Sequence, residues 1–295
     1  MPNPDPRYYR RGYAYALAAA ACGGIVPTLS KLVSTSGPLE VSALIALLGG
    51  GILIPYKAKV VPRKNDFFLL LPIGILGAAV GPFLYISGIR ETTAVNASLL
   101  VNGELFFTSI IAFVAFRETL KRKQLLLGLL VVTGIITVST NLDLSSVQFT
   151  SGLGGNLLII ASTFLFGIEN NLSRIASQRF GPALVTKYRN LIGGVVLLTV
   201  MIGISAPFTV SFGALPLVLA LAVANAATVL FTISALRRIG AVRTLLVFST
   251  TSIFGSIFAL IFLKEQITPV QILGGAFMLS GIYLIQRSED RPSPL

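Results

Sequence analysis

The chain has 295 residues, of which 54% are apolar and only 12% are charged. A water-soluble domain carries about 25% charged residues because its surface must be hydrated, so this composition excludes an ordinary soluble globular protein. The net charge of +12 does not indicate nucleic-acid binding. The basic residues stand in short clusters between long apolar blocks, as they do in proteins embedded in lipid. We therefore interpret the chain as an all-α integral membrane protein.

The apolar blocks predict the transmembrane helices. About 20 residues are needed to cross a bilayer as a helix, and ten blocks approach that length. In chain order they cover roughly residues 13–33, 39–56, 67–88, 93–116, 123–139, 153–174, 183–205, 213–236, 241–262 and 269–286. The first block follows Arg7, Arg10 and Arg11 and in this respect looks like a secretory signal. Its similarity to the sixth block predicts instead that it stays in the fold.

The basic residues predict the orientation of these helices. All of the 23 lysines and arginines except Lys31, Arg90 and Lys264 fall on one side of the ten-span arrangement, Arg189 among them. Cytoplasmic loops of membrane proteins are enriched in Lys and Arg. We therefore expect both termini to lie in the cytoplasm.

Two halves of the chain repeat each other. The stretch "AFRETLKRKQLLLGLLVVTG" (115–134) returns as "FLKEQITPVQILGGAFMLSG" (262–281), and "GIVPTLSKL" (24–32) returns as "GIENNLSRI" (167–175). We predict two units, 13–139 and 153–286, each of five helices. Because five is odd, the second unit must cross the membrane in the opposite sense to the first. Such inverted repeats are typical of secondary transporters; a duplication that serves packing alone is the alternative.

These motifs resemble the drug/metabolite transporter (DMT) superfamily in its ten-helix form with two EamA-type repeats. The resemblance rests on an alanine that opens the fourth span of each half, an acid at its end, and two glycines in the fifth span. These residues are Ala94, Glu118, Gly128 and Gly134, and in the second half Ala241, Glu265, Gly275 and Gly281. Members often have Glu-Pro in the fourth span, where this chain has Glu104 and Leu105.

The resemblance implies a fold, a location and a class of substrates. It implies a central cavity among the first, third, fourth, sixth, eighth and ninth helices, with the fifth and tenth helices outside. It also implies a multi-pass protein of the bacterial inner membrane that exports amino acids, other metabolites or amphipathic drugs. Among such exporters, an aromatic amino-acid exporter of the YddG type is the nearest that we can name.

Two acids, Glu104 and Glu169, lie well inside predicted spans. An ionised acid at the bilayer centre costs about 2.5–3.5 kcal/mol, so it normally faces a cavity or a partner. The sequence shows no cation at the depth of Glu104. Burial without a cation favours the protonated carboxyl, which makes Glu104 a candidate proton carrier, with a hydrogen bond across helices as the alternative. Glu169 lies nearer the headgroups and either belongs to the site or pairs with Arg174 or water.

Uncharged residues complete the predicted site. Asn225, Thr228 and Thr232 share one face of the eighth predicted helix. The other candidates for substrate contact are polar or aromatic residues of the predicted cavity helices: Tyr85, Asn102, Asn171 and Thr251. Such polar residues also join membrane helices to one another without touching substrate. Three residues inside helices are hinge candidates or, alternatively, static kinks: Pro27, Gly81 and Pro82.

The sequence therefore predicts a secondary transporter that exports small amphipathic metabolites, amino acids above all, by alternating access around a central cavity. Proton-coupled efflux of cationic compounds and a channel-like facilitator are the alternatives. With no histidine, one cysteine and two embedded acids, catalysis has few groups to use, so we expect no enzyme activity, no metal and no cofactor. The expected partners are a small-molecule substrate, the lipid bilayer and, with coupling, protons, but not nucleic acid. The oligomeric state stays open, and a monomer is compatible.

Overall fold

The structure is a computed structural model that describes residues 6–57, 60–116, 122–140 and 151–289. All regular structure in these residues is helical. By length and composition, five helices can cross a membrane: Tyr8–Leu32, Lys64–Glu91, Gly152–Phe180, Pro182–Gly203 and Phe212–Gly240. Shorter apolar helices lie at Pro38–Gly51, Leu129–Val138, Thr251–Leu263 and Pro269–Gly281. The predicted all-α membrane architecture is thus confirmed for the described residues.

The helices of the first half follow the predicted spans closely. In chain order they are α1 (Pro6–Leu32), α2 (Pro38–Gly51), η1 (Lys64–Asp66), α3 (Phe67–Gly74), the π-helical segment η2 (Ile75–Val80), α4 (Gly81–Glu91), α5 (Ala94–Leu100), α6 (Gly103–Phe116) and α7 (Arg122–Thr140). The helix α5 begins where Thr93, in an extended conformation, accepts a 3.0 Å hydrogen bond from the backbone N–H of Asn96. This is the usual N-cap arrangement of a threonine. The helix α2 ends earlier than the predicted residue 56.

The helices of the second half are α8 (Ser151–Phe180), α9 (Pro182–Gly203), η3 (Phe212–Ala214), α10 (Leu215–Phe248), α11 (Thr251–Phe258), the π-helical segment η4 (Ala259–Leu263) and α12 (Pro269–Glu289). Two glycines mark the boundaries between consecutive helices. Gly181 has a φ of +78° between α8 and α9, and Gly240 has a φ of +76° within α10. Glycine adopts this left-handed region without a steric penalty. Gly240 therefore divides α10 into the separate eighth and ninth predicted spans.

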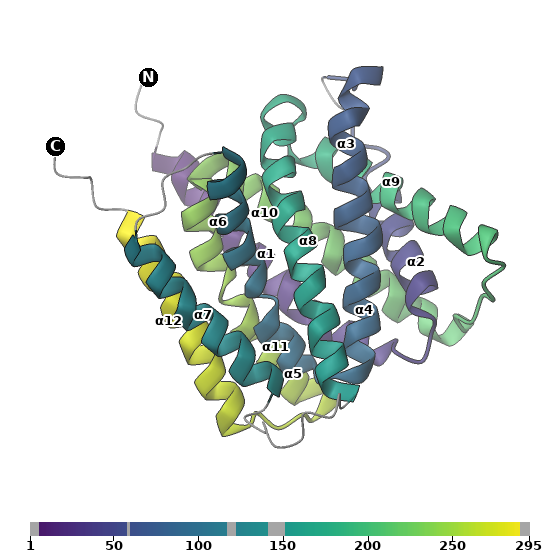
Figure 1. Ribbon diagram of the computed structural model, residues 1–295. Coiled ribbons are helices and arrows are strands. Elements are labelled where there is room, and N and C mark those ends of the chain that lie inside the picture. Colours follow the sequence, from purple (N-terminus) through teal and green to yellow (C-terminus); the bar gives the residue numbers. More distant parts are fainter. Residues whose placement is uncertain (1–5, 58–59, 117–121, 141–150, 290–295) are drawn as a thin grey trace.

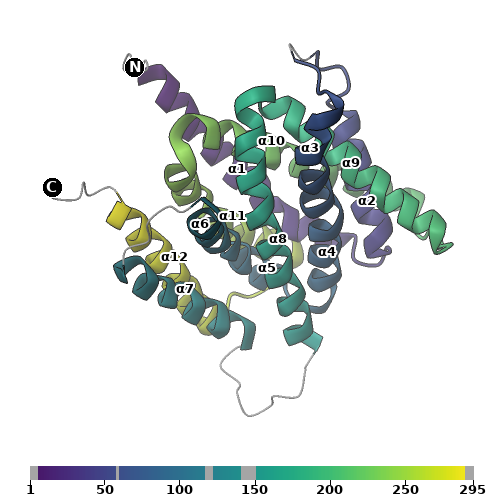
Figure 2. The same ribbon diagram turned by 45° about the horizontal axis from the view of Figure 1, so that its top comes forward.

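The helices form a bundle with two flanking pairs. Figures 1 and 2 show α7 and α12 side by side on one flank and α2 beside α9 on the other, with α1, α4, α6, α8, α10 and α11 between them. The first turns of α1 and the last turns of α12 lie at the same end of the bundle (Figure 1). The central helices are thus placed to enclose a cavity.

The glycines of the repeated phrases bring α7 and α12 together. A Cβ on Gly134 would lie 2.4 Å from Met278 Cγ and 2.5 Å from the Gly274 carbonyl oxygen. A Cβ on Gly274 would lie 2.6 Å from Val138 Cγ2. Small residues permit such close approach of membrane helices. Gly134, one of the repeated glycines, therefore serves helix packing against Gly274 and Met278, whereas Glu118 and the side-chain surroundings at position 128 lie outside the described residues.

The hinge candidates occupy irregular or tightly packed positions. Pro27 lies inside α1, and Pro82 lies in the first turn of α4, directly after the π-helical segment. A π-helical turn interrupts the regular α-helical hydrogen-bond pattern, and such turns are frequent at functional sites. Gly81 packs so closely on α8 that a Cβ there would lie 2.5 Å from Phe166 Cε1. Movement about these residues stays a prediction.

Candidate functional site

A cavity of about 100 Å³ lies among the central helices. It is lined by α1, α4, α8, α10 and α11, by the fourth predicted span, and by Ile45 of α2. These include all six helices that the family resemblance implies. The wall is mainly apolar and carries the rings of Tyr85, Phe166 and Phe248 together with the Glu104 side chain. The residues that the sequence singled out and that line this cavity are Pro82, Tyr85, Glu104, Asn225, Thr228 and Thr251.

A second cavity of about 80 Å³ adjoins the first, because both are lined by Glu104, Asn225 and Thr228. It extends to the ionisable residues Glu169 and Arg189, and to Asn170 and Thr232. Asn225, Thr228 and Thr232 all line this space from α10, and their contact with substrate stays a prediction. We call the two adjoining cavities the central cavity.

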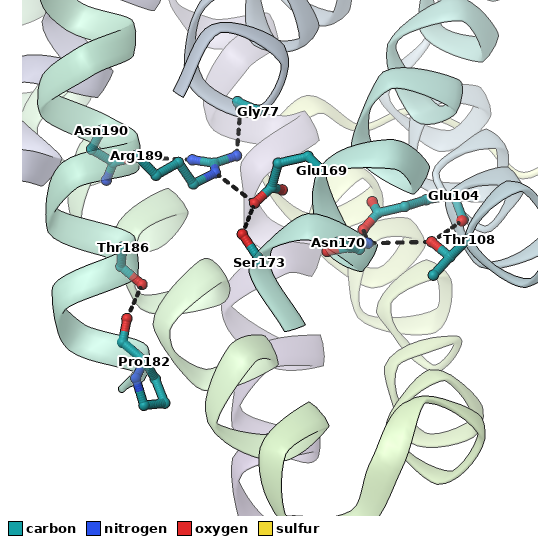
Figure 3. Close-up of polar contacts among 10 residues, drawn as sticks. All are labelled: Gly77, Glu104, Thr108, Glu169, Asn170, Ser173, Pro182, Thr186, Arg189 and Asn190. Carbon is teal, nitrogen blue, oxygen red and sulfur yellow. Dashed lines mark hydrogen bonds and ion pairs between the residues drawn. The ribbon is translucent and has the colours of Figure 1, made fainter. Parts of the chain in front are cut away.

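Glu104 is held by a hydrogen bond between two helices. The Asn170 side-chain nitrogen donates to Glu104 Oε1 at 2.6 Å, which ties α6 to α8 (Figure 3). The Thr108 hydroxyl donates to the backbone carbonyl of Glu104 at 2.7 Å. The predicted hydrogen bond across helices is therefore present, on a residue that also lines the cavity. A role of Glu104 in carrying protons stays a prediction.

Arg189 forms a buried ion pair with Glu169. Its Nε lies 3.5 Å from Glu169 Oε1, and the two side chains are 3% and 5% exposed. The rest of the guanidinium donates to Asn190 Oδ1 at 2.8 Å and to the Gly77 carbonyl oxygen, while the Ser173 hydroxyl donates to Glu169 Oε1 (Figure 3). The prediction that no cation lies at the depth of Glu104 is wrong. Counting basic residues by side cannot detect an arginine whose side chain points into the bundle.

Two predicted contact residues do not line the central cavity. The Asn171 side-chain nitrogen donates to the carbonyl oxygens of Thr108 at 3.0 Å and Gly167 at 2.9 Å, so it joins α8 to α6. Asn102 is buried in the turn between α5 and α6. The sequence pattern favoured Asn171 as a contact residue, whereas the structure places Asn170 beside Glu104. Two adjacent asparagines give no pattern that separates these roles.

Several hydroxyl groups of the cavity wall are buried without a hydrogen-bond partner among the described residues. They are Ser30 Oγ, Tyr85 Oη, Thr251 Oγ1 and Thr232 Oγ1. A buried polar group left without a partner costs about 1–3 kcal/mol. A molecule that satisfies these groups would recover that cost, so the wall is suited to a ligand with both apolar and hydrogen-bonding parts.

Charged side chains join the helices at the end of the bundle at which α5 begins. Lys31 Nζ donates to the carbonyl oxygens of Ile89 at 2.9 Å and Thr92 at 2.6 Å. The Glu265 carboxylate accepts from the backbone N–H groups of Ala94 at 3.1 Å and Val95 at 3.0 Å. These contacts tie α1, the end of α4, the start of α5 and the segment before α12 together. Hydrogen bonds of ionised groups are among the stronger ones, so these segments are held firmly to one another.

Comparison with known proteins identifies the family. The model of the EamA-like transporter family matches residues 10–140 and 153–287. The chain belongs to the EamA-like transporter family. It is thus a multi-pass membrane transporter of the drug/metabolite transporter superfamily.

Relatives of this EamA-family protein are also named as transporters. A transporter from Methanothermobacter thermautotrophicus is 29% identical over 94% of this chain and 87% of its own length. YyaM of Bacillus subtilis is 25% identical over 68% of this chain and 64% of its own length. A solved crystal structure superposes with a TM-score of 0.69 over 95% of this chain and 99% of that chain, at 13% identity, which is a likeness of fold alone. These names give no substrate, so the resemblance to an aromatic amino-acid exporter of the YddG type stays a prediction.

Proposed function

We propose that this EamA-family transporter exports small amphipathic metabolites, aromatic amino acids foremost, by alternating access around the central cavity. The proposal rests on the chemical groups that line the wall of that cavity. The Glu104 carboxylate suits an ammonium group, the unpartnered hydroxyls suit a carboxylate, and the rings of Tyr85, Phe166 and Phe248 suit an apolar body. A zwitterion with an apolar side chain offers all three.

The pairing of helices supports an inverted repeat of two five-helix units, 13–139 and 153–286. Exchanging the units turns the α1–α10 contact into the α8–α4 contact, and the α1–α11 contact into the α8–α6 contact. It leaves the pairs α2–α9 and α7–α12 unchanged. All of these contacts occur, as expected for a pseudo-two-fold axis that relates two units in ten spans. One sequence can then supply a gate at each end of the central site.

The charges support an orientation with both termini in the cytoplasm of a bacterium, across its inner membrane. The first turns of α1 and the last turns of α12 share one end of the bundle. The opposite end carries the Lys31 and Glu265 contacts and would face outward. The structure then corresponds to a state that is closed to the outside, from which export requires these contacts to open.

Proton-coupled efflux of cationic compounds is the second candidate. One observation favours it: Glu169 and Arg189 neutralise each other, whereas Glu104 has no salt-bridge partner among the described residues. A cationic substrate and a proton would then compete for the Glu104 carboxylate.

Uptake into proteoliposomes distinguishes these candidates. The panel consists of phenylalanine, leucine, phenylethylamine and tetraphenylphosphonium, each with and without an imposed pH gradient. We expect phenylalanine uptake to saturate with concentration and to show counter-transport. Glu104→Gln should weaken transport, since an amide keeps the hydrogen bond from Asn170 but loses the charge, whereas the exposed Glu91→Gln should not. Undiminished pH dependence in Glu104→Gln would exclude Glu104 as the proton carrier.

Two other outcomes would overturn the proposal. Uptake of the two cations without either amino acid would favour cationic efflux. Flux that neither saturates nor shows counter-transport would favour a channel-like facilitator over alternating access.

A further inference from the structure

A third cavity lies on the outer side of α10, away from the central cavity. It measures about 360 Å³ and is formed by the start of α1, the segment after α2, the start of α9 and part of α10. Its wall combines aromatic and basic side chains: Tyr8, Tyr15, Tyr56, Pro182, Ala183, Leu230, Ser234, Arg237 and Arg238. The described residues of this wall include two arginines and no acid, so its charge is positive. We call it the arginine–tyrosine pocket.

Helical spacing places this pocket on the lipid side of α10. Leu230, Ser234 and Arg237 follow one another at four and three residues, so they share a face that is opposite to the face of Thr228 and Thr232. Leu219 and Val223 precede them on that same outer face, and each is 48% exposed. In a chain that spans a membrane, such an exposed apolar stripe contacts acyl chains. The pocket lies on this outer side of α10, at the end that carries Arg237 and Arg238.

The Arg238 guanidinium is held by its neighbours and still has N–H groups without a partner among the described residues. Its guanidinium carbon lies 4.8 Å from the ring centre of Tyr15 and 5.6 Å from that of Tyr8, as in cation–π contacts. One terminal nitrogen donates to the Ser234 carbonyl oxygen at 3.1 Å, and Nε is buried without a partner among the described residues. Arg237 lines the same pocket and is exposed. The planar guanidinium groups of Arg237 and Arg238 present several N–H donors, an arrangement that matches the oxygens of a phosphate group.

We propose that the arginine–tyrosine pocket binds the phosphate headgroup of an anionic phospholipid, with an acyl chain along Leu219 and Val223. Tyrosines concentrate where membrane meets water, and basic pockets between helices on the cytoplasmic side recognise anionic headgroups. The pocket lies at the end of the bundle where α1 begins, which is the end that we assign to the cytoplasm. A bound lipid would link α1, α9 and α10 from outside without entering the transport site.

Native mass spectrometry of the purified full-length protein in detergent tests this proposal. The probes are phosphatidylglycerol and phosphatidylcholine with identical chains. We expect wild type to retain phosphatidylglycerol preferentially, and Arg237→Gln with Arg238→Gln to lower that retention about tenfold while phosphatidylcholine retention stays the same. The matched control is Arg243→Gln, an exposed arginine of α10 outside the pocket. The single variant Arg237→Gln, at an exposed position, repeats the measurement with little risk to folding.

The same experiment separates the lipid from a soluble phosphate compound. Glycerol 3-phosphate carries the headgroup chemistry without acyl chains, and we expect it not to displace phosphatidylglycerol. Displacement at equal concentration would overturn the lipid assignment in favour of a soluble phosphate ligand. Equal retention of phosphatidylglycerol by wild type and the arginine variants would overturn the site itself.

Discussion

Arg189 and Glu169 neutralise each other inside the bundle, where Nε and Oε1 lie 3.5 Å apart and neither side chain is more than 5% exposed. Asn190, Ser173 and the Gly77 carbonyl form further hydrogen bonds with the pair, whereas Arg189 Nε makes the ion-pair contact but no hydrogen bond among the described residues. The pair borders the same cavity as Glu104. The cavity thus holds one compensated and one uncompensated carboxylate, and each should respond differently to substitution.

The ion pair should matter for stability. We expect Arg189→Gln to destabilise the protein by up to about 3–5 kcal/mol, because it leaves the Glu169 carboxylate buried without its cation. The double variant Arg189→Gln with Glu169→Gln also lacks the carboxylate charge, so it should recover most of the lost stability. Thermal unfolding in detergent measures both, with the exposed Arg243→Gln as control. A double variant as unstable as the single one would show that the charge pairing is not the cause.

The close approach of α7 and α12 gives a second stability prediction. Gly134→Ala places a methyl group 2.4 Å from Met278 Cγ, and such overpacking typically costs about 1–3 kcal/mol. Gly51→Ala is the matched control, because nothing lies within 4 Å of its added Cβ. We expect the unfolding temperature to fall for Gly134→Ala and not for Gly51→Ala. Equal shifts in both would contradict the packing role of Gly134.

The contacts of Glu265 give a prediction about conformation. Glu265→Ala removes the acceptor of the Ala94 and Val95 N–H groups, so the closed end should open more often. The reporter is a cysteine at Ser30 in the cavity wall, in a background where Cys22 is replaced by serine. A membrane-impermeant thiol reagent added outside should label it several-fold faster in Glu265→Ala. The exposed Glu91→Ala controls for loss of a carboxylate, and an unchanged labelling rate in Glu265→Ala would argue against a gate here.

Much of the fold could be predicted from the sequence, because each transmembrane helix must by itself be long enough and apolar enough to cross the bilayer. The predicted spans coincide with described helices to within a few residues at most ends. Asn225, Thr228 and Thr232, whose spacing puts them on one face of α10, line the same cavity. Periodicity and hydrophobic length are local properties, so they can be read without knowing the neighbours. The break at Gly240 was likewise visible as the gap between two apolar blocks.

The pairing of buried polar groups could not be read in this way. Arg189 lies near the start of α9, where a basic residue is normally assigned to the membrane surface, and its partner Glu169 lies on α8. Only the packing of those two helices brings the charges together. The choice between Asn170 and Asn171 beside Glu104 depends on the rotation of α8 about its axis. The ion pair and the rotation of α8 depend on tertiary packing, which the residue pattern along a single helix does not reveal.

The unpartnered hydroxyls of the cavity wall allow a test that separates binding from packing. Tyr85→Phe and Thr251→Val each remove a buried polar atom that has no partner among the described residues. Because an unsatisfied buried group is unfavourable, these variants should unfold at the same temperature as wild type or at a higher one.

The same variants should nevertheless transport less well. Each would lose one hydrogen bond to substrate, about 1 kcal/mol, so KM should rise about fivefold. Thr199→Val on α9 is the control, since its exposed hydroxyl donates to the Val195 carbonyl oxygen outside the cavity wall. Stability and KM are measured by thermal unfolding and proteoliposome uptake. Unchanged KM in Tyr85→Phe and Thr251→Val would mean that these hydroxyls do not contact the substrate, whereas a fall in stability would mean that they are structural.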